Sequence, residues 1–314
     1  MQERNLGRSG LRVSAVGLGC NNLGARIDDA AAKAVVHRAL DAGITLFDTA
    51  DHYGERGGSE TVLGNLLGAR RKDIILATKF GLQMDDEGWL KGTSRRYIMS
   101  AVEASLKRLK TDWIDLYQMH FPDPLTPIEE TVRAMDDLVR QGKVRYIGCS
   151  NTPGWQVVDA LWWSRTMGTE AFVSCQDEYS LVVRGVEKEL IPAITGRGLG
   201  LLPYFPLASG LLTGKYTSRN DLPAGTRFAK IERFADKYMT PRNMEIVEKL
   251  NAFCAARDHT LLELAFSWLL AQPVVPSVIA GASRPEQIDA NIAASQWQLT
   301  AEELAEIDQI TKGA

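Results

Sequence analysis

Eight short apolar runs, most of them followed by a segment with helical spacing, constrain the fold more than any other feature of this chain. This alternation is typical of strand-helix units around a parallel sheet. Eight units in 314 residues fit a closed (β/α)8 barrel better than an open doubly wound sheet. We therefore predict an α/β fold, a TIM barrel, as a single domain over residues 1–314. The predicted strands are 16–19, 44–48, 74–78, 115–120, 144–149, 173–176, 199–204 and 275–279.

The segments between these strands carry signals for helices. The clearest start is at Thr126, which fits a capping box with Glu129 and has Pro127 at the first helical position. Gly142 marks the end of the same helix, because glycine favours the position just after a helix. Further helices are predicted from apolar spacing in residues 30–40, 60–67, 98–109, 155–166 and 186–194.

Three segments depart from the alternation. Residues 5–13 predict a small β-hairpin with Ser9 and Gly10 as its turn, placed as a cover over the amino-terminal end of the barrel. Long loops follow the third strand, at residues 81–93, and the seventh strand, at about 205–240. Long ordered loops in barrels tend to be functional, so both are candidates for binding.

Composition excludes several classes of function. The hydrophobic fraction of 45% and charged fraction of 24% are those of a globular protein, and the net charge of −3 provides no basic surface for nucleic acid or anionic lipid. The amino terminus has no apolar signal core, and the most apolar late stretch, 261–272, contains Glu263 and is too short to span a membrane. We expect a cytoplasmic protein with neither nucleic-acid nor membrane partners.

A metal site is not expected. The cysteines show no CxxC spacing, and the histidines form no HxH or HExxH pattern. Reduced, buried thiols are the simpler reading. The residues concerned are Cys20, Cys149, Cys175, Cys254, His37, His52, His120 and His259.

Four ionisable residues stand at or just after predicted strand ends: Asp48, Tyr53, Lys79 and His120. Singly, each has an ordinary role as a helix cap, a solvated end or a packed side chain. The carboxyl ends of barrel strands meet at one mouth, however, where Lys79 would favour the phenolate of Tyr53 and Asp48 would keep Lys79 charged. His120 would hydrogen-bond a substrate oxygen. Such a site polarises a carbonyl but has no hydride source, so it requires a cofactor.

At these residues the chain resembles the aldo-keto reductase superfamily over nearly its whole length. The resemblance implies Asp48, Tyr53, Lys79 and His120 as a catalytic tetrad, Tyr53 as general acid/base, and NADPH as cofactor. The sequence is more similar to bacterial branches and to potassium-channel β-subunits than to aldose reductases. The motifs are FDTADHYG, LATKFG, DLYQMHFPD, GKVRYIGCSN, QDEYSL, YFPLASGLLTGKY and IAGASRPEQIDANI.

The resemblance also implies three groups of cofactor contacts. One group binds the nicotinamide carboxamide and stacks on its ring: Ser150, Asn151, Gln176 and Tyr204. A second lines the pyrophosphate and adenosine path: Leu207, Ser209, Gly210, Leu211, Lys215 and Arg227. A third holds the adenosine end: Gly281, Ala282, Ser283, Gln287 and Asn291. The chain departs from the family at Phe205, where serine is common, which puts the local pyrophosphate contact in doubt.

One cofactor contact also follows from the residues themselves. Ser283-Arg284-Pro285-Glu286 predicts a helix start after the eighth strand, where free N–H groups and Arg284 suit an anion such as a 2′-phosphate. This favours NADPH over NADH. The alternative reading is an ordinary capping box with a solvated arginine.

The substrate pocket and the reaction leave alternatives open. His52, Met84, Trp89 and Phe121 are candidates for an apolar, aromatic pocket, and each equally fits a packing role. Rival functions are an NADPH-binding sensor or scaffold with little turnover, and a Schiff-base aldolase using Lys79, although Asp48 would oppose its deprotonation. A Rossmann dehydrogenase is disfavoured because residues 17–22 lack the third glycine of the fingerprint. No coiled-coil pattern indicates an oligomeric state.

Overall fold

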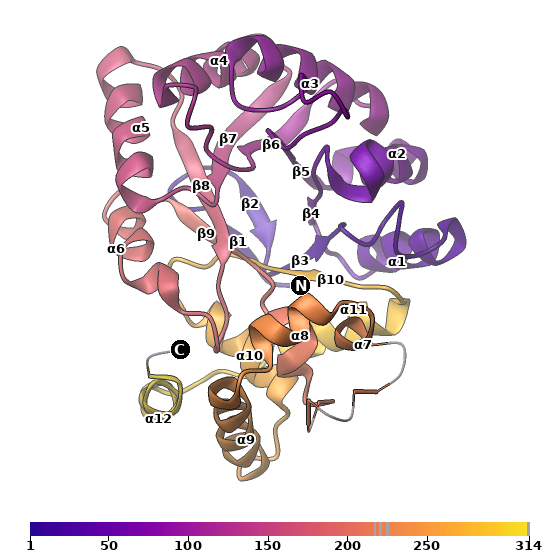
Figure 1. The fold of residues 1–314 in the computed structure, drawn as a ribbon, viewed down its shortest axis with the longest axis vertical. Helices are drawn as coiled ribbons and strands as arrows, with labels where there is room; N and C mark the ends of the chain where they lie inside the picture. The colour runs from indigo at the N-terminus through magenta and orange to yellow at the C-terminus, as the bar shows by residue number, and fades with distance from the viewer. Residues whose placement is uncertain (217, 220–221, 224–225, 313–314) are drawn as a thin grey trace.

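A computed structural model describes residues 1–216, 218–219, 222–223 and 226–312, and within them eight parallel strands form one sheet (Figure 1). The strands follow one another around the sheet in chain order, and the last pairs with the first. The Leu201 N–H donates to the Val274 carbonyl (2.8 Å), which joins the remaining edges. The predicted TIM barrel is confirmed. Its strands are β3 Val16–Gly19, β4 Leu46–Asp48, β5 Ile75–Phe80, β6 Ile114–Met119, β7 Val144–Ser150, β8 Phe172–Glu178, β9 Gly200–Tyr204 and β10 Val278–Gly281.

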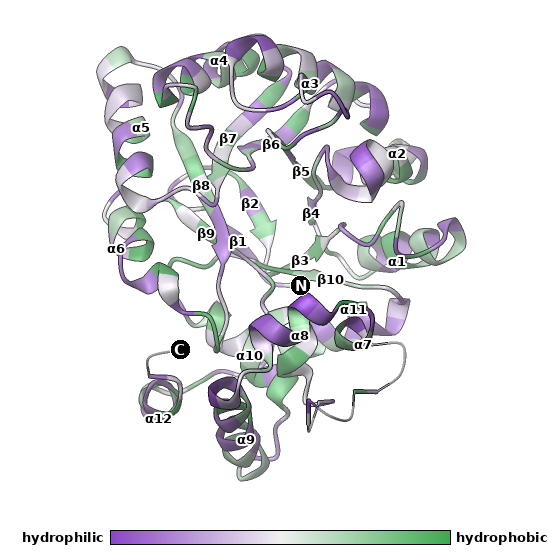
Figure 2. Ribbon diagram, viewed as in Figure 1, coloured by the Kyte–Doolittle hydropathy of each residue, from purple (hydrophilic) through white to green (hydrophobic). Residues whose placement is uncertain are grey.

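Helices surround the sheet (Figure 1). Figure 2 shows α3 and α4 carrying both purple and green, as expected for helices with one apolar face toward the strands. The longer helices are α1 Asp29–Asp41, α2 Tyr53–Leu67, α3 Arg95–Leu109, α4 Ile128–Arg140, α5 Gly154–Met167, α9 Pro241–Ala255, α10 Leu261–Leu270, α11 Pro285–Ala294 and α12 Ala301–Thr311. The short ones are η1 Gly68–Asp73, η2 Gly185–Glu187, α6 Leu190–Thr195, η3 Ala208–Thr213, α7 Arg227–Lys230 and α8 Glu232–Tyr238.

Two predicted helical features are wrong in detail. The capping box at Thr126 does not form, because Pro127 and not Thr126 occupies the cap position of α4. The Thr126 hydroxyl donates to the Asp123 carboxylate (2.8 Å). The single helix predicted over residues 186–194 is two elements, η2 and α6. Pro192 explains the break, since proline has no N–H to donate and is tolerated only in the first turn of a helix, and α6 begins two residues before it.

The amino-terminal hairpin forms between β1 (Glu3–Asn5) and β2 (Arg12–Ser14). Its turn differs from the prediction: the loop spans residues 6–11, and the positive φ of +58° falls at Gly7 rather than at Ser9 or Gly10. A Cβ at Gly7 would lie 2.3 Å from the Gly198 carbonyl oxygen, so only glycine fits. The hairpin covers the amino-terminal end of the barrel through one apolar cluster of Leu6, Leu11, Val13, Leu46, Ala77, Leu116, Leu202 and Ile279.

A second, larger apolar cluster lies between the strands and the helices. All four cysteines belong to the buried residues and are free thiols, as predicted. Among the described residues, none of the helices combines the length and the apolar character that crossing a membrane requires. Over the same part of the chain, His, Cys, Asp and Glu side chains nowhere gather in a group of three fit to ligate a metal.

Candidate active site

The four predicted catalytic residues lie together at the mouth of the barrel. Asp48 ends β4, Lys79 is the penultimate residue of β5, and His120 follows β6 directly. Tyr53 begins α2, five residues after Asp48. The side chains of Asp48, Lys79 and His120 are buried, and Tyr53 is partly exposed. The parallel register of adjacent strands brings these chain-distant residues to the same point.

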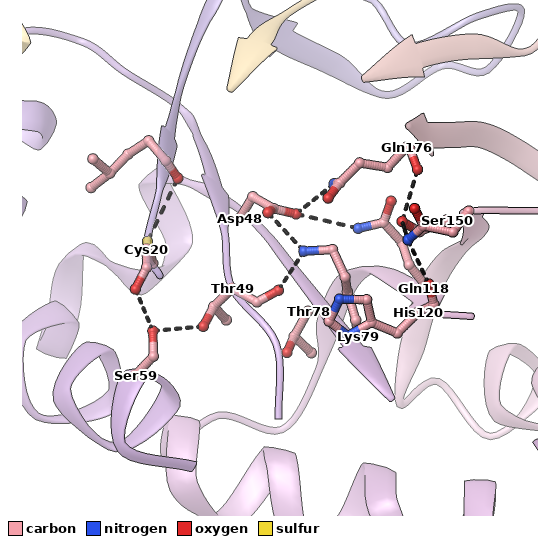
Figure 3. Close-up of polar contacts among 12 residues, drawn as sticks. Cys20, Asp48, Thr49, Ser59, Thr78, Lys79, Gln118, His120, Ser150 and Gln176 are labelled. Carbon is pink, nitrogen blue, oxygen red and sulfur yellow. Dashed lines mark hydrogen bonds and ion pairs between the residues drawn. The ribbon is translucent and has the colours of Figure 1, made fainter. Parts of the chain in front are cut away.

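Asp48 and Lys79 form a buried ion pair (Figure 3). The Lys79 Nζ lies 2.7 Å from Asp48 Oδ2 and donates a second bond to the Thr49 carbonyl (2.9 Å). The other carboxylate oxygen, Oδ1, accepts from Gln176 Nε2 (2.8 Å) and from Gln118 Nε2 (3.4 Å). Asp48 therefore accepts from three donors, and Lys79 is held in place by its carboxylate.

The electrostatics of the site favour a charged lysine, a protonated tyrosine and a neutral histidine. Burial lowers the pKa of Lys79, but Asp48 and Tyr53 outweigh it, so this pKa lies above 10.5. Burial raises the pKa of Tyr53, and the Lys79 cation offsets this only in part. Lys79 thus favours the phenolate, as expected, but burial outweighs it and the net pKa of Tyr53 is raised. Burial, with Lys79 and His52, lowers the pKa of His120 well below 6.5.

Three aromatic rings and the Lys79 cation define the space above the ion pair. The Lys79 Nζ lies 5.0 Å from the centroid of the Tyr53 ring. The rings of Tyr53 and His120 meet edge to face, with centroids 5.7 Å apart, and Phe121 stacks on His120 at 5.4 Å. Among the described residues no group hydrogen-bonds His120 Nδ1. The Tyr53 phenol and the neutral His120 imidazole are therefore both available to hydrogen-bond one small group.

The residues predicted to bind a nicotinamide carboxamide form one hydrogen-bonded group beside His120. Asn151 adopts a left-handed conformation (φ +52°), and its Nδ2 donates to the His120 carbonyl (3.0 Å) and to Ser150 Oγ (2.9 Å). The Tyr204 hydroxyl donates to Asn151 Oδ1 (2.8 Å), and the Ser150 hydroxyl donates to the Gln176 carbonyl (2.7 Å). These contacts fix side chains from β7, β8 and β9 at the mouth.

The loop after β9 has the strained backbone of a binding loop. Phe205, Ala208 and Ser209 have φ values of +50°, +45° and +57°, and Gly210 has +108°. Left-handed conformations at ordinary residues each cost about 1–3 kcal/mol and concentrate at functional sites, where turned N–H groups receive anions. This loop fits a nucleotide pyrophosphate. Also on it, Leu207 is partly buried, Leu211 is buried, and Lys215 is exposed.

The comparisons agree with this geometry. A model of the aldo/keto reductase family matches residues 15–312. YrpG, an uncharacterized oxidoreductase of Bacillus subtilis, is 38% identical over 323 residues, which cover 100% of this chain and 97% of that protein.

The chain belongs to the aldo/keto reductase family.

Two further relatives of this reductase carry different names. A probable voltage-gated potassium channel subunit beta from rice is 38% identical, over 94% of this chain and 91% of its own length. L-glyceraldehyde 3-phosphate reductase from Escherichia coli is 35% identical, over 98% of this chain and 92% of its own length. The family acts on carbonyl compounds and generally binds NAD(P)H, so this reductase is an oxidoreductase of small carbonyl substrates.

The residues predicted for the adenosine end of the cofactor lie at and near the start of α11. The predicted helix start is confirmed at Pro285, but the alternative capping box is wrong, because the cap residue Arg284 makes no side-chain cap bond. Arg284 is exposed and lies 3.9 Å from the Glu286 carboxylate. The Ser283 N–H and hydroxyl both donate to Gln287 Oε1 (2.7 and 3.2 Å). Of the remaining three, Gly281 is exposed, while Ala282 and Asn291 are buried.

The structure places the four residues predicted for the substrate pocket in different surroundings. Phe121 stacks beside the site with 45% of its surface exposed, and the ring of His52 hydrogen-bonds the Gln83 carbonyl through Nδ1 (3.0 Å). Met84 packs against the large apolar cluster. Trp89 is 83% exposed, so the structure does not bring it into the pocket.

Sequence reasoning missed three residues of this reductase. Gln118 bonds Asp48, and it had a readable signal: a polar residue inside an apolar strand, two positions before His120 and thus on the same face. Asn22 and Arg26 lie in the loop after β3. Arg26 and Arg227, the latter from the long loop after β9, both donate to Asn22 Oδ1. No local pattern predicts that convergence, because it depends on how two distant loops meet.

Proposed function

We propose that this protein reduces an aldehyde or ketone to the alcohol, with NADPH as cofactor and Tyr53 as the proton donor. The observation that carries the proposal is the buried Asp48–Lys79 pair at 2.7 Å, with the Tyr53 ring 5.0 Å from the lysine nitrogen. A buried cation beside a phenol stabilises the negative charge that develops on its oxygen as the proton leaves.

Each residue has a separate task in this proposal. Tyr53 holds a proton at neutral pH, since the pKa of a phenol is about 10 and burial raises that of Tyr53 further, and it donates this proton to the carbonyl oxygen. Lys79 stays charged and polarises Tyr53, while Asp48 keeps Lys79 oriented. Neutral His120 hydrogen-bonds and orients the substrate oxygen. A bound NADPH supplies the hydride.

The cofactor would lie across the mouth, from the Ser150–Asn151–Tyr204 group, along the strained loop after β9, to the start of α11. The left-handed turns at Phe205, Ala208 and Ser209 support this path. We also propose that residues 1–314 act as one domain and that the protein works in the cytoplasm. No partner besides the small-molecule substrate is needed for the reaction.

The substrate class follows from the rings at the mouth. Phe121 is 45% exposed and stacks on His120, so it presents an apolar, aromatic face next to the reacting oxygen. We propose that aromatic or medium-chain carbonyl compounds bind better than highly charged ones.

The direct test is the Tyr53→Phe variant, measured as NADPH oxidation with a panel of aldehydes and ketones. We expect turnover to fall by about 10²–10⁴-fold, because the variant lacks the proton donor. Tyr146→Phe, a tyrosine that packs at the opposite end of the barrel, is the matched control and should keep full activity. If the wild type shows no turnover above Tyr53→Phe on any carbonyl, the proposed enzyme function is wrong.

Two rival functions remain testable against this one. A nucleotide-binding sensor or scaffold is suggested by the relative named as a probable channel subunit, and it predicts tight NADPH binding without turnover. A Schiff-base aldolase needs a neutral Lys79 amine, whereas Asp48 holds the pKa of Lys79 above its usual value. Trapping of a carbonyl substrate on Lys79 by borohydride would support the aldolase.

A further inference from the structure

Two buried carboxyl groups behind the mouth share one cation. Glu60 of α2 is fully buried, and its carboxylate accepts from Arg108 Nε (2.7 Å) and from the Thr78 hydroxyl (2.5 Å). Asp51, in the loop between β4 and α2, is 1% exposed and close enough to Glu60 for their charges to repel. In the part of the chain that the structure describes, Arg108 pairs with Glu60 and no cation forms an ion pair with Asp51. The cluster therefore holds one negative charge too many unless Asp51 keeps a proton.

The side chains around Asp51 come from α2, α3 and β6. Tyr97 of α3 donates its hydroxyl to Asp51 Oδ2 over 3.4 Å, which is a weak contact. The Tyr117 hydroxyl of β6 is buried in the same cluster and has no hydrogen-bond partner among the described residues. Glu60 of α2 and Arg108 of α3 complete the set. A protonated carboxyl can donate to an oxygen in these surroundings, whereas a carboxylate meets only a cation that is paired elsewhere.

The titration of Asp51 agrees with this arrangement. Burial, together with the negative charge of Glu60, raises the pKa of Asp51 to about 8. Arg108 and the hydrogen bonds from the His52 N–H and the Tyr97 hydroxyl oppose this rise without cancelling it. Asp51 is therefore neutral at pH 7 and becomes charged as the pH rises through this value.

The backbone of Asp51 connects it to two of the proposed catalytic residues. The Asp51 N–H donates to the Lys79 carbonyl (3.0 Å), and the Lys79 Nζ donates to the Thr49 carbonyl (2.9 Å), a contact drawn in Figure 3. Tyr53 follows Asp51 by two residues, and its N–H donates to the Ala50 carbonyl (3.1 Å). The short segment that carries Asp51 thus joins Lys79 to Tyr53, so a displacement of this segment changes the position of both.

We propose that protonated Asp51 is a positioning residue for Tyr53 and Lys79, and that loss of its proton inactivates the protein as the pH rises. The inference rests on the proposed function and adds a residue that touches neither substrate nor cofactor. A neutral carboxyl is stable among the buried side chains of α2, α3 and β6. A carboxylate is repelled by Glu60 and gains by turning toward water, which moves the segment that leads to Tyr53.

The experiment is the pH profile of kcat for NADPH-dependent carbonyl reduction by the wild type and by Asp51→Asn, from about pH 6 to pH 10. Wild-type kcat should fall about tenfold per pH unit above about pH 8, as for the loss of one proton. Asp51→Asn keeps the shape of the protonated carboxyl and cannot ionise. It should match the wild type at pH 7 within about twofold and keep this rate up to the range in which Tyr53 ionises.

Two further variants sharpen the assignment. Asp177→Asn is the matched control, because it removes another buried carboxyl whose pKa is about 8, on β8, and it should keep the wild-type profile. Glu60→Gln removes the repelling charge and frees Arg108 to pair with Asp51, which lowers the pKa of Asp51. In that variant the loss of kcat should therefore begin at a lower pH than in the wild type.

Three results would overturn the inference: Asp51→Asn loses kcat at the same pH as the wild type, Asp177→Asn abolishes that loss, or Glu60→Gln leaves its pH unchanged. If the wild type reduces no carbonyl at any pH, the proposed function fails. The protonation of Asp51 is then tested by thermal unfolding. The stability of Asp51→Asn relative to the wild type should grow as the pH rises toward about 8, because the folded wild type keeps a proton that its unfolded chain has lost. Parallel unfolding curves would mean that Asp51 is already ionised.

Discussion

The two ends of the barrel bury very different side chains on the same strands. At the end covered by the hairpin, Leu6 and Val13 pack against Leu46 in a wholly apolar cluster. At the mouth, Asp48 and Lys79 are equally buried but charged. Leu46 and Asp48 are only two residues apart on β4 and therefore lie on the same face of the strand. Two residues along one strand therefore separate a position that contributes stability from a position proposed to be catalytic.

The difference shows which end supplies stability. Apolar burial at the covered end contributes about 25 cal/mol per Å² of surface removed from water. A buried ion pair at the mouth contributes little net stability, because desolvation of both charges cancels most of their attraction. The mouth also contains left-handed backbone at Asn151 and Ser209, which costs further free energy. Changes at the two ends should therefore separate stability from turnover.

The largest effect is expected from Lys79→Met at the mouth. Turnover should fall by about 10²–10⁴-fold, and the free energy of unfolding by about 3–5 kcal/mol, because the variant leaves the buried Asp48 charge without its partner. NADPH binding, measured by fluorescence quenching, should persist. The double variant Lys79→Met with Asp48→Asn removes the unpaired charge and should regain stability in urea unfolding. Recovery of turnover in the double variant would contradict the role assigned to Lys79.

At the covered end, Leu6→Ala should lower stability and leave turnover unchanged. Leu6 is fully buried, so we expect the free energy of unfolding to fall by about 3 kcal/mol, with kcat per folded molecule unchanged. Urea unfolding and steady-state kinetics measure the two effects. Leu125→Ala, at a leucine that is 91% exposed, is the control for the substitution itself and should change neither. A large drop in kcat for Leu6→Ala would show that the two ends are coupled.

An effect seen only as a change with pH concerns Asp177, a carboxyl on β8 beside Gln176 that has no partner for Oδ2 among the described residues. Burial raises its pKa to about 8, against about 3.9 in an unfolded chain. Between these values the folded state keeps a proton that the unfolded state has lost. Wild-type stability should therefore fall with rising pH in this window, by up to about 1.4 kcal/mol per pH unit from this group.

The variant Asp177→Asn keeps the shape of the protonated carboxyl and cannot ionise. Its stability relative to the wild type should grow from pH 5 to pH 8 and then level off. Thermal unfolding across this range measures the difference. Parallel curves for the two proteins would mean that Asp177 is ionised in the folded state.

The sequence predicted the barrel and the positions of the four proposed catalytic residues because both depend on local patterns. Strand ends are readable from the apolar runs, and parallel strands of one sheet necessarily bring Asp48 and Lys79 to the same edge. The hairpin was also readable, although its left-handed residue is Gly7, because close contact with Gly198 decides the turn and neighbouring sequence does not.

The features that could not be predicted from the sequence depend on burial and on contacts between residues far apart in the chain. The raised pKa of Tyr53 reflects burial, which no local pattern reports. The hydrogen bonds of Arg26 and Arg227 to the same Asn22 oxygen depend on the paths of two loops that are far apart in the chain. Thr126 matched a capping box, but α4 begins one residue later than that pattern requires, with Pro127 as its cap residue, and the Thr126 hydroxyl donates to Asp123.

The sheet closes by pairing β3 with β10, in a register that sets Val16 beside Val278. The two partners lie near opposite ends of the chain, so the ribosome must release almost all of it before this seam can form. Until then, the nascent sheet has two bare edges, each able to pair with a strand of another molecule. Biosynthesis of this reductase therefore passes through an aggregation-prone stage that ends only when its final strand arrives.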